Sequence, residues 1–172
     1  MNKTLLPLML ATLLLTDPAV ASEPFKYQYF TIGVGPIRGA GLTLNRAVAS
    51  YGLNLGRHFS LEGQVTRGID DEYETINEIW QKVEARWGYG GFGVLRFPIG
   101  SRGGDVFLRA GFEDNKLRTE YGRLSGEGDM RGFSYGIGFN VFSGVGGGVR
   151  LLYSRIRESE ARAFTVSYRL QF

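Results

Sequence analysis

The only histidine of the chain lies two residues before a serine, in His58-Phe59-Ser60. A histidine that takes the proton of a serine hydroxyl, and is itself oriented by a carboxylate, creates the nucleophile of many hydrolases. These two residues are therefore the candidate pair for catalysis. His58, however, falls in what we interpret as a tight turn between two strands, where a polar ring is unremarkable. We expect no catalysis and keep a hydrolase using His58 and Ser60 as an alternative.

A second group of chemically active side chains is a run of carboxylates, made of Asp70, Asp71, Glu72, Glu74 and Glu78. Carboxylates bind Ca²⁺, but the D-x-D-x-D-G order with a closing glutamate is missing, so we expect a solvated loop and no metal site. Later loops are basic, with Arg118, Arg123, Arg155, Arg157 and Arg162. Guanidinium groups form strong hydrogen bonds to phosphate, which predicts contact with phosphorylated lipid headgroups there.

The composition of the chain limits the classes of protein to which it can belong. Its 172 residues include 26 glycines, 13% aromatic residues and no cysteine. Without sulfur ligands, a disulfide scaffold and a thiolate metal site are excluded. The net charge of +3 comes from scattered basic residues, a distribution that does not predict nucleic-acid binding. About one residue in seven is glycine, against a usual share of about 7%, which indicates tight turns and close backbone approaches within one domain.

The first 21 residues have the pattern of a cleaved secretory signal peptide. Lys3 provides a basic start, residues 5–15 are an apolar run, and Ala19-Val20-Ala21 supplies the small residues that signal peptidase recognises. The run is shorter than the roughly 18 to 20 apolar residues that span a bilayer as a helix. We therefore assign residues 1–21 to a signal peptide and residues 22–172 to one mature domain.

The mature chain alternates apolar and polar residues in segment after segment, which is typical of β-strands. The last segment is the most regular, because every second residue from Phe164 to Phe172 is apolar. The first is less regular, because Tyr27 and Tyr29 fall on the face opposite to its other apolar residues. The alternation predicts eight strands, at residues 27–35, 47–56, 59–66, 89–97, 105–113, 133–141, 145–154 and 164–172.

Charge falls on only one face of these predicted strands. An ionised side chain that faces lipid at mid-bilayer costs about 2–4 kcal/mol, and the apolar faces carry none. The opposite faces are rich in glycine and serine, as the crowded interior of a narrow barrel requires. We therefore predict that the apolar face points to lipid and the polar face lines the lumen. The charged lumen residues are then Glu62, Arg96, Arg109, Glu113, Arg150 and Arg169, and we expect them to form a network that fills the barrel, because buried charges persist only when paired.

Long and short connections alternate between the predicted strands. Residues 36–46, 67–82 and 114–131 are expected to be long loops, residues 57–58, 98–104 and 142–144 short turns, and residues 155–162 a charged loop. Transmembrane barrels have short periplasmic turns and longer outer loops. Within the second long loop, a helical spacing over residues 76–83 overlaps a strand parity over residues 83–89, and we expect a strand from Val83 onward.

Together these features resemble the small eight-stranded outer-membrane β-barrels of Gram-negative bacteria, whose members include the OmpA transmembrane domain and the OmpX/Ail adhesins. The resemblance covers the mature chain and is carried by residues 51–56, 59–63, 95–98, 132–138 and 166–172. It implies an all-β, eight-stranded antiparallel up-and-down transmembrane barrel in the bacterial outer membrane. The final strand is similar to the signal read by the outer-membrane assembly machinery, with Phe164, Val166, Tyr168, Leu170 and Phe172 as its apolar positions.

The resemblance implies a structural, porin-like or adhesin-like role for a monomer. The expected partners are outer-membrane lipids, lipopolysaccharide and the assembly machinery, with no cofactor and no nucleic acid. Barrels that deacylate lipid A also use a His-x-Ser arrangement, but their pattern continues with Asn where this chain has Leu61, and their site lies near the C-terminal strands. A soluble barrel that binds a lipid inside is a further alternative, and it requires the apolar face to point inward.

Overall fold

The computed structural model describes residues 28–39, 42–76, 79–99, 104–121, 124–143 and 146–172. The segment 1–21 lies outside these residues, so its assignment to a signal peptide stays a prediction. Among the described residues, no helix is long and apolar enough to cross a membrane. The described chain consists of strands and the turns between them.

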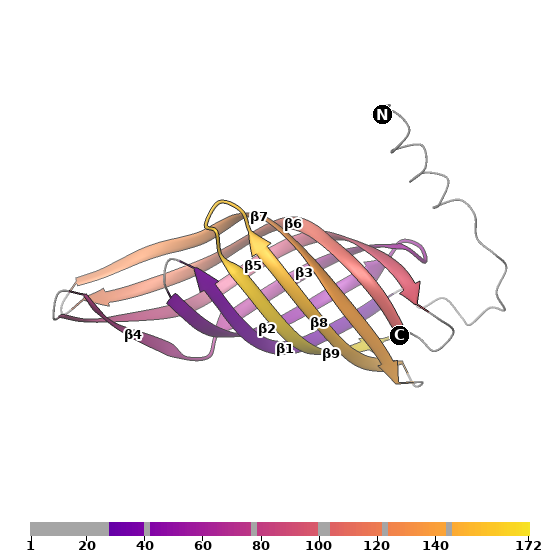
Figure 1. Ribbon diagram of the computed structural model, residues 1–172, viewed down its shortest axis with the longest axis horizontal. Coiled ribbons are helices and arrows are strands. Elements are labelled where there is room, and N and C mark those ends of the chain that lie inside the picture. The colour runs from indigo at the N-terminus through magenta and orange to yellow at the C-terminus, as the bar shows by residue number, and fades with distance from the viewer. Residues whose placement is uncertain (1–27, 40–41, 77–78, 100–103, 122–123, 144–145) are drawn as a thin grey trace, which may run out of the picture.

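The described residues form nine strands in one antiparallel sheet (Figure 1). Most strands pair with the next one along the chain, as expected when short hairpins connect them. The strands are β1 (Gln28–Gly39), β2 (Leu42–Asn54), β3 (Phe59–Gly68), β4 (Asp71–Ile76), β5 (Ile79–Ile99), β6 (Gly104–Tyr121), β7 (Leu124–Ser143), β8 (Gly147–Ile156) and β9 (Arg162–Gln171).

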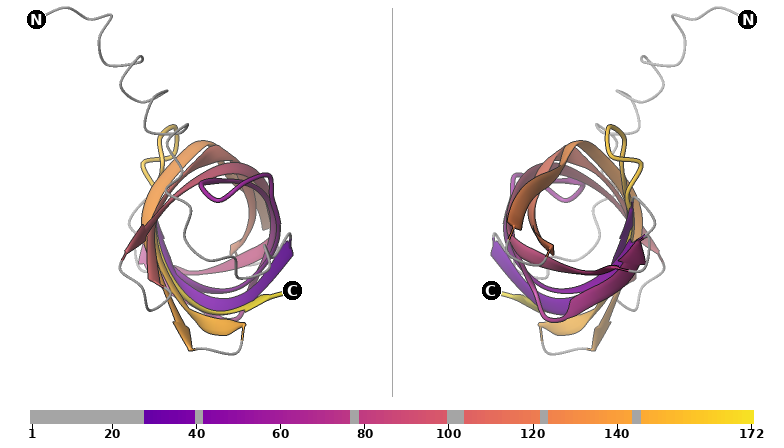
Figure 2. Two further views of the ribbon diagram at one scale, coloured as in Figure 1. Left: turned by 90° about the vertical axis from the view of Figure 1, so that its right-hand side faces the viewer. Right: turned by 90° about the vertical axis from the view of Figure 1, so that its left-hand side faces the viewer.

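Two pairings between strands that are not consecutive close eight of these strands into a ring, which Figure 2 shows end-on. β1 pairs with β9, and β3 pairs with β5 from Phe59↔Leu95 to Arg67↔Trp87. β4 lies outside the ring because it pairs with β5 alone. A closed ring leaves no unpaired sheet edge in its wall, which is the condition for a sheet to cross lipid. The predicted eight-stranded antiparallel barrel is confirmed.

The three long loops predicted at residues 36–46, 67–82 and 114–131 are wrong in extent. β1 continues to Gly39, and β2 already begins at Leu42. β6 and β7 likewise remain paired as far as Tyr121↔Leu124. The strand predictions relied on an apolar face that points outward. Beyond the membrane that requirement disappears, so the strands continue without the pattern that marked them.

The helical spacing over Ile76, Ile79, Trp80 and Val83 does not form a helical turn. Ile76 and Ile79 are instead partners at the tip of the β4–β5 hairpin. The expected strand from Val83 onward is present, and it begins earlier, at Ile79. A shift in register between Ala85 and Gly88 marks a β-bulge in β5, where Arg86 and Trp87 are both exposed.

The two faces of the barrel wall differ as predicted over most of their length. Outward-facing aliphatic and aromatic side chains such as Ile32, Tyr51 and Phe112 are exposed, while inward-facing polar and charged side chains are buried. An apolar belt around the whole ring far exceeds the patches that soluble monomers expose, so this belt faces lipid. The alternative of a soluble barrel with a lipid inside is contradicted, because the apolar face points outward.

At one end of the barrel the inward face changes from polar to apolar. A buried hydrophobic cluster occupies this end, formed by Ile37, Leu44, Val83, Met130, Ile156, Ala161 and Ala163. We call it the outer cluster. It lies on the side of the barrel where β4, β5, β6 and β7 project well past the other strands (Figure 1). These four strands form a protruding sheet above the ring.

We predict that Gly111→Ala lowers the free energy of unfolding by about 1–3 kcal/mol, the usual cost of overpacking. A methyl group at Gly111 would collide with the backbone of Gly91 and Phe92 on β5. Gly63 is the matched control, because it faces outward and no heavy atom lies within 4 Å of the position its methyl group would take. Urea unfolding in lipid vesicles measures both variants, and equal stabilities would contradict the close approach at Gly111.

Candidate functional site

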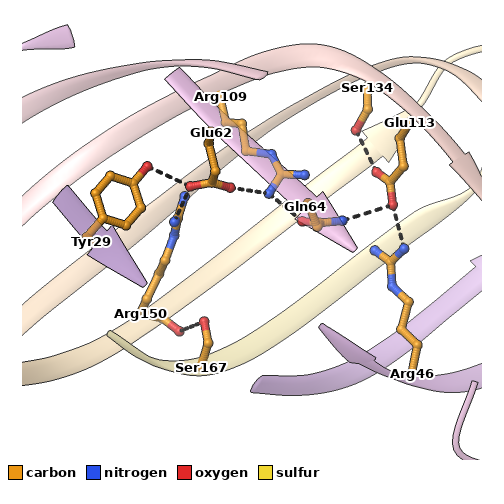
Figure 3. Close-up of polar contacts among 9 residues, drawn as sticks. All are labelled: Tyr29, Arg46, Glu62, Gln64, Arg109, Glu113, Ser134, Arg150 and Ser167. Carbon is orange, nitrogen blue, oxygen red and sulfur yellow. Dashed lines mark hydrogen bonds and ion pairs between the residues drawn. The ribbon is translucent and has the colours of Figure 1, made fainter. Parts of the chain in front are cut away.

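The centre of the lumen is organised around one carboxylate, that of Glu62 on β3 (Figure 3). Arg109 of β6 donates a hydrogen bond to its Oε1 at 2.9 Å, and Arg150 of β8 donates one to its Oε2 at 2.5 Å. The Tyr29 hydroxyl of β1 also donates to Oε2, at 2.7 Å. Four strands around the ring therefore meet at Glu62.

Aromatic rings cover the arginines that surround Glu62. The guanidinium carbon of Arg109 lies 3.3 Å from the centre of the Phe92 ring, and that of Arg150 lies 4.2 Å from the centre of the Phe107 ring. Contacts of this kind stabilise a desolvated cation by about 2 kcal/mol. The rings thus partly replace the water that the arginine side chains lose in the lumen.

A second polar cluster lies closer to the outer cluster and is centred on Glu113 of β6. Arg46 of β2 donates to Glu113 Oε1 at 2.5 Å, and Ser134 of β7 donates to Oε2 at 3.2 Å. Gln64 links the two clusters, because its Oε1 accepts from Arg109 at 2.8 Å and its Nε2 donates to Glu113 at 3.5 Å. Together these contacts form one hydrogen-bonded network across the ring, which we call the lumen network.

The opposite end of the lumen holds further arginines. Arg96 of β5 donates to Asn54 Oδ1 at 2.7 Å. Asp105 accepts a hydrogen bond from Asn140, which fixes the position of this carboxylate. The Arg169 guanidinium of β9 stacks on the Tyr29 ring at 4.0 Å. Below the outer cluster, polar side chains thus fill most of the lumen, together with a small buried apolar cluster of Val94, Phe107 and Leu152.

All six predicted lumen residues are buried in the interior. Glu62, Arg109 and Arg150 are joined directly, and Gln64 connects them with Glu113. Arg96 and Arg169 lie further toward the opposite end. Whether the six residues act as a functional site stays a prediction. The exposed fractions of the six residues are 3% for Glu62, 7% for Arg96, 3% for Arg109, 2% for Glu113, 2% for Arg150 and 1% for Arg169.

Several members of the lumen network were missed by the sequence analysis. Arg46 was placed in a loop, although its parity with Val48 and Ser50 continues the inward face of β2. Tyr29 was noted only as an irregularity of the first strand, yet its position on the polar face is what brings it to Glu62. Phe92 and Phe107 also lie on the polar face and were not recognised as partners of arginine.

His58 and Ser60 are engaged with different partners. His58 Nδ1 lies 3.0 Å from the backbone oxygen of Arg96, within the turn after β2. The Ser60 hydroxyl is fully buried and donates to Asn54 Oδ1 at 3.0 Å. This geometry gives no support to a base–nucleophile pair.

The five residues of the predicted assembly signal, four on the last strand, β9, and one directly after it, face outward, toward lipid. Their side chains are 42–60% exposed in the isolated chain. Their role as an assembly signal stays a prediction. The set is Phe164, Val166, Tyr168, Leu170 and Phe172.

The charged groups beyond the lipid-facing belt are mostly solvated. Asp70 accepts two hydrogen bonds from Asn45, one from its backbone N–H at 2.8 Å and one from Nδ2 at 2.6 Å. On the protruding sheet, a hydrogen bond to Asp129 raises the pKa of Lys116. Within the described residues, no group of three acidic or histidine side chains is placed to hold a metal ion. Glu78 and Arg123, which the sequence analysis singled out, lie outside those residues.

We predict that Glu62→Gln destabilises the barrel by about 3–5 kcal/mol, because it leaves the buried cations of Arg109 and Arg150 without their carboxylate. The matched control is Glu127→Gln, which removes an exposed carboxylate from β7 and changes stability by less than about 0.5 kcal/mol. Urea unfolding in lipid vesicles, followed by heat-dependent gel mobility, checks both. Equal effects of the two variants would contradict the central position of Glu62.

Comparison with known proteins places this geometry in a family. The family model described as the outer membrane protein beta-barrel domain matches residues 8–172. The search of curated proteins finds no match.

Three solved structures illustrate the similarity of the fold. The N-terminal β-barrel domain of Pseudomonas aeruginosa OprF has a TM-score of 0.63 at 11% identity, over 86% of this chain and 98% of that chain. Ail of Yersinia pestis, in complex with the heparin analogue sucrose octasulfate, has a TM-score of 0.58 at 11% identity, with the same two coverages. Neisserial surface protein A has a TM-score of 0.58 at 14% identity, over 85% of this chain and 96% of that chain.

At these identities the structures show the fold alone, whereas the family model covers nearly the whole chain. The wall, the outward apolar belt and the charged interior are those expected of a barrel that crosses a bilayer. The chain belongs to the outer membrane protein beta-barrel domain family and is a bacterial outer-membrane protein.

Proposed function

We propose that this protein is a non-catalytic, adhesin-like barrel that holds a binding sheet above the outer membrane. The observation that carries the proposal is that the pairing of β5, β6 and β7 extends from the barrel wall into the protruding sheet, as far as Gln81↔Tyr121 and Tyr121↔Leu124, with one bulge in β5. A flexible loop would not need such pairing. A paired sheet instead presents a fixed backbone surface to the exterior.

Both sides of the protruding sheet end in strand edges that other chains can use. β4 is the terminal strand on one side. On the other side, the pairing of β7 with β8 begins only at Ser134↔Ile156, so among the described residues no strand pairs with the outer edge of residues 124–131. Exposed edges bind extended polypeptides by adding a strand, with main-chain hydrogen bonds supplying the affinity. We therefore take the partner to be an extended protein segment.

The lumen supports a filling role better than a channel. An eight-stranded barrel is just wide enough for its own side chains, and here Glu62, Arg109, Arg150 and Glu113 are bound to one another or to neutral partners across it. We assign the lumen network to fixing the shape of the barrel. A porin-like role is the competing function, and the two differ in what a lumen substitution should change.

Lipid and assembly partners follow from the outward face. Arg155 and Arg162 are partners in the β8–β9 hairpin, just above the apolar belt, and Arg157 lies in the turn that joins these strands. Arg118 lies on β6, in the protruding sheet. We propose that these residues bind the phosphates of lipopolysaccharide, that β9 is read by the assembly machinery, and that the barrel acts as a monomer.

Shortening the β6–β7 hairpin should remove binding to a matrix protein. Joining Lys116 to Asp129 through an Asn-Gly turn keeps the barrel strands and deletes the tip. If several main-chain hydrogen bonds of about 0.5–1.5 kcal/mol each carry the contact, retention on immobilised matrix protein falls by about tenfold or more. Glu62→Gln, assayed where it is folded, should retain binding. Unchanged binding after the deletion would contradict the adhesin-like role.

Planar-bilayer recording tests the lumen separately. The wild-type protein, reconstituted from the folded state, should give no channel events, because side chains fill the barrel at each level. Frequent openings in the wild type that disappear or change size with Glu62→Ala would instead establish the porin-like function.

A further inference from the structure

The outer cluster brings together apolar side chains from most strands of the ring at the outer mouth of the barrel. Its members come from β1, β2, β5, β7, β8 and β9 and from the turn between β8 and β9, and each is 0–4% exposed. Leu42, Ala85 and Leu117 are partly buried and pack against it. The opening that faces the cell exterior is thus filled by apolar side chains from nearly every strand of the ring.

The outer cluster lies above the membrane, since the outward side chains at its level are polar. Ile37 is followed by exposed Arg38, Leu44 by exposed Asn45, and Met130 by exposed Arg131. Lipid would exclude such groups from the outer wall. The strands therefore reverse their pattern along their length, with apolar groups outward in the bilayer and inward in the water above it.

The level directly beneath the outer cluster is polar. On β2 the next inward residue after Leu44 is Arg46, which binds Glu113 at 2.5 Å. On β8 the next inward residue below Ile156 is Ser154, which is 2% exposed. Polar side chains fill most of the rest of the lumen, apart from a smaller apolar cluster, and could have filled the mouth as well. Apolar side chains differ from polar ones in their effect on water, because a narrow hydrophobic constriction excludes water and dissolved ions.

We infer that the outer cluster is a hydrophobic seal that closes the lumen to water and solutes from outside the cell. Ion pairs such as Arg46–Glu113 then lie in an environment of low dielectric constant, where their attraction is stronger than in water. In this arrangement the lumen network fixes the shape of the barrel, and the seal makes the outer mouth impermeable. The inference concerns the lumen and does not depend on what the protruding sheet binds.

Single cysteines can report on the seal, because the chain has none of its own. Ser154→Cys places a thiol one inward step beneath Ile156, and Ser125→Cys places one on the exposed part of β7. The folded protein in lipid nanodiscs is treated with a small cationic methanethiosulfonate, and labelling is followed by mass spectrometry. The Ser154→Cys thiol should react at least about tenfold more slowly than the Ser125→Cys thiol, since reaction requires local opening.

Opening the seal should then expose the reporter. Adding Leu44→Ser or Met130→Ser to Ser154→Cys should raise its labelling rate by about tenfold or more, because a polar side chain lets water enter the constriction. Arg131→Ser is the matched control, since Arg131 neighbours Met130 but points outward, and it should leave the rate unchanged. Heat-dependent gel mobility verifies folding, and Leu44→Ala replaces any variant that fails to fold.

Two results would overturn the inference. One is labelling of the Ser154→Cys thiol as fast as that of the exposed thiol while the seal is intact. The other is a labelling rate that stays low in folded Leu44→Ser, Met130→Ser and Leu44→Ala alike, which would mean that the lumen is closed by the side chains beneath the outer cluster.

Discussion

The backbone hydrogen bonds between β3 and β5 close the sheet, and the remaining features of the molecule follow from that closure. Without this ladder, β3 and β5 would each expose a row of unpaired amide and carbonyl groups, which lipid does not tolerate. Closure also fixes the width of the interior. Eight strands leave space for side chains but little else, so the inward positions of the wall carry glycines, small polar residues and a limited number of large side chains.

Within that narrow interior, Glu62 contacts more strands than its own neighbours in the sheet. It is bound by groups from β1, β6 and β8, so a slip of any of these strands by one residue would turn its ligand outward and leave a buried charge unpaired. A buried ion pair is weak evidence for stability in itself, but its strict geometry penalises alternative registers. The geometry of the lumen network therefore favours this register over its neighbours.

The sequence predicts the strands well where they cross the membrane, because contact with lipid restricts which residues can face outward. Between Phe133 and Val141, for example, lipid demands an apolar residue at every second position, and the predicted strand matches the inner part of β7 closely. Where that rule ends, prediction failed. The outer part of β6 and β7 reads as a loop because nothing there requires alternation. Arg46 was missed for the same reason, and the pairing of Glu62 with Arg109 and Arg150 could not be derived because it depends on distances across the ring.

The length of β5, β6 and β7 has a mechanical consequence. These strands have 21, 18 and 20 residues and run without a break from the lipid-facing wall into the protruding sheet. A pulling force on the tip is therefore directed along the strands, and it loads many inter-strand hydrogen bonds in shear at the same time. A flexible loop under the same tension would simply extend. Tension on the protruding sheet would therefore pass directly to the wall that spans the bilayer.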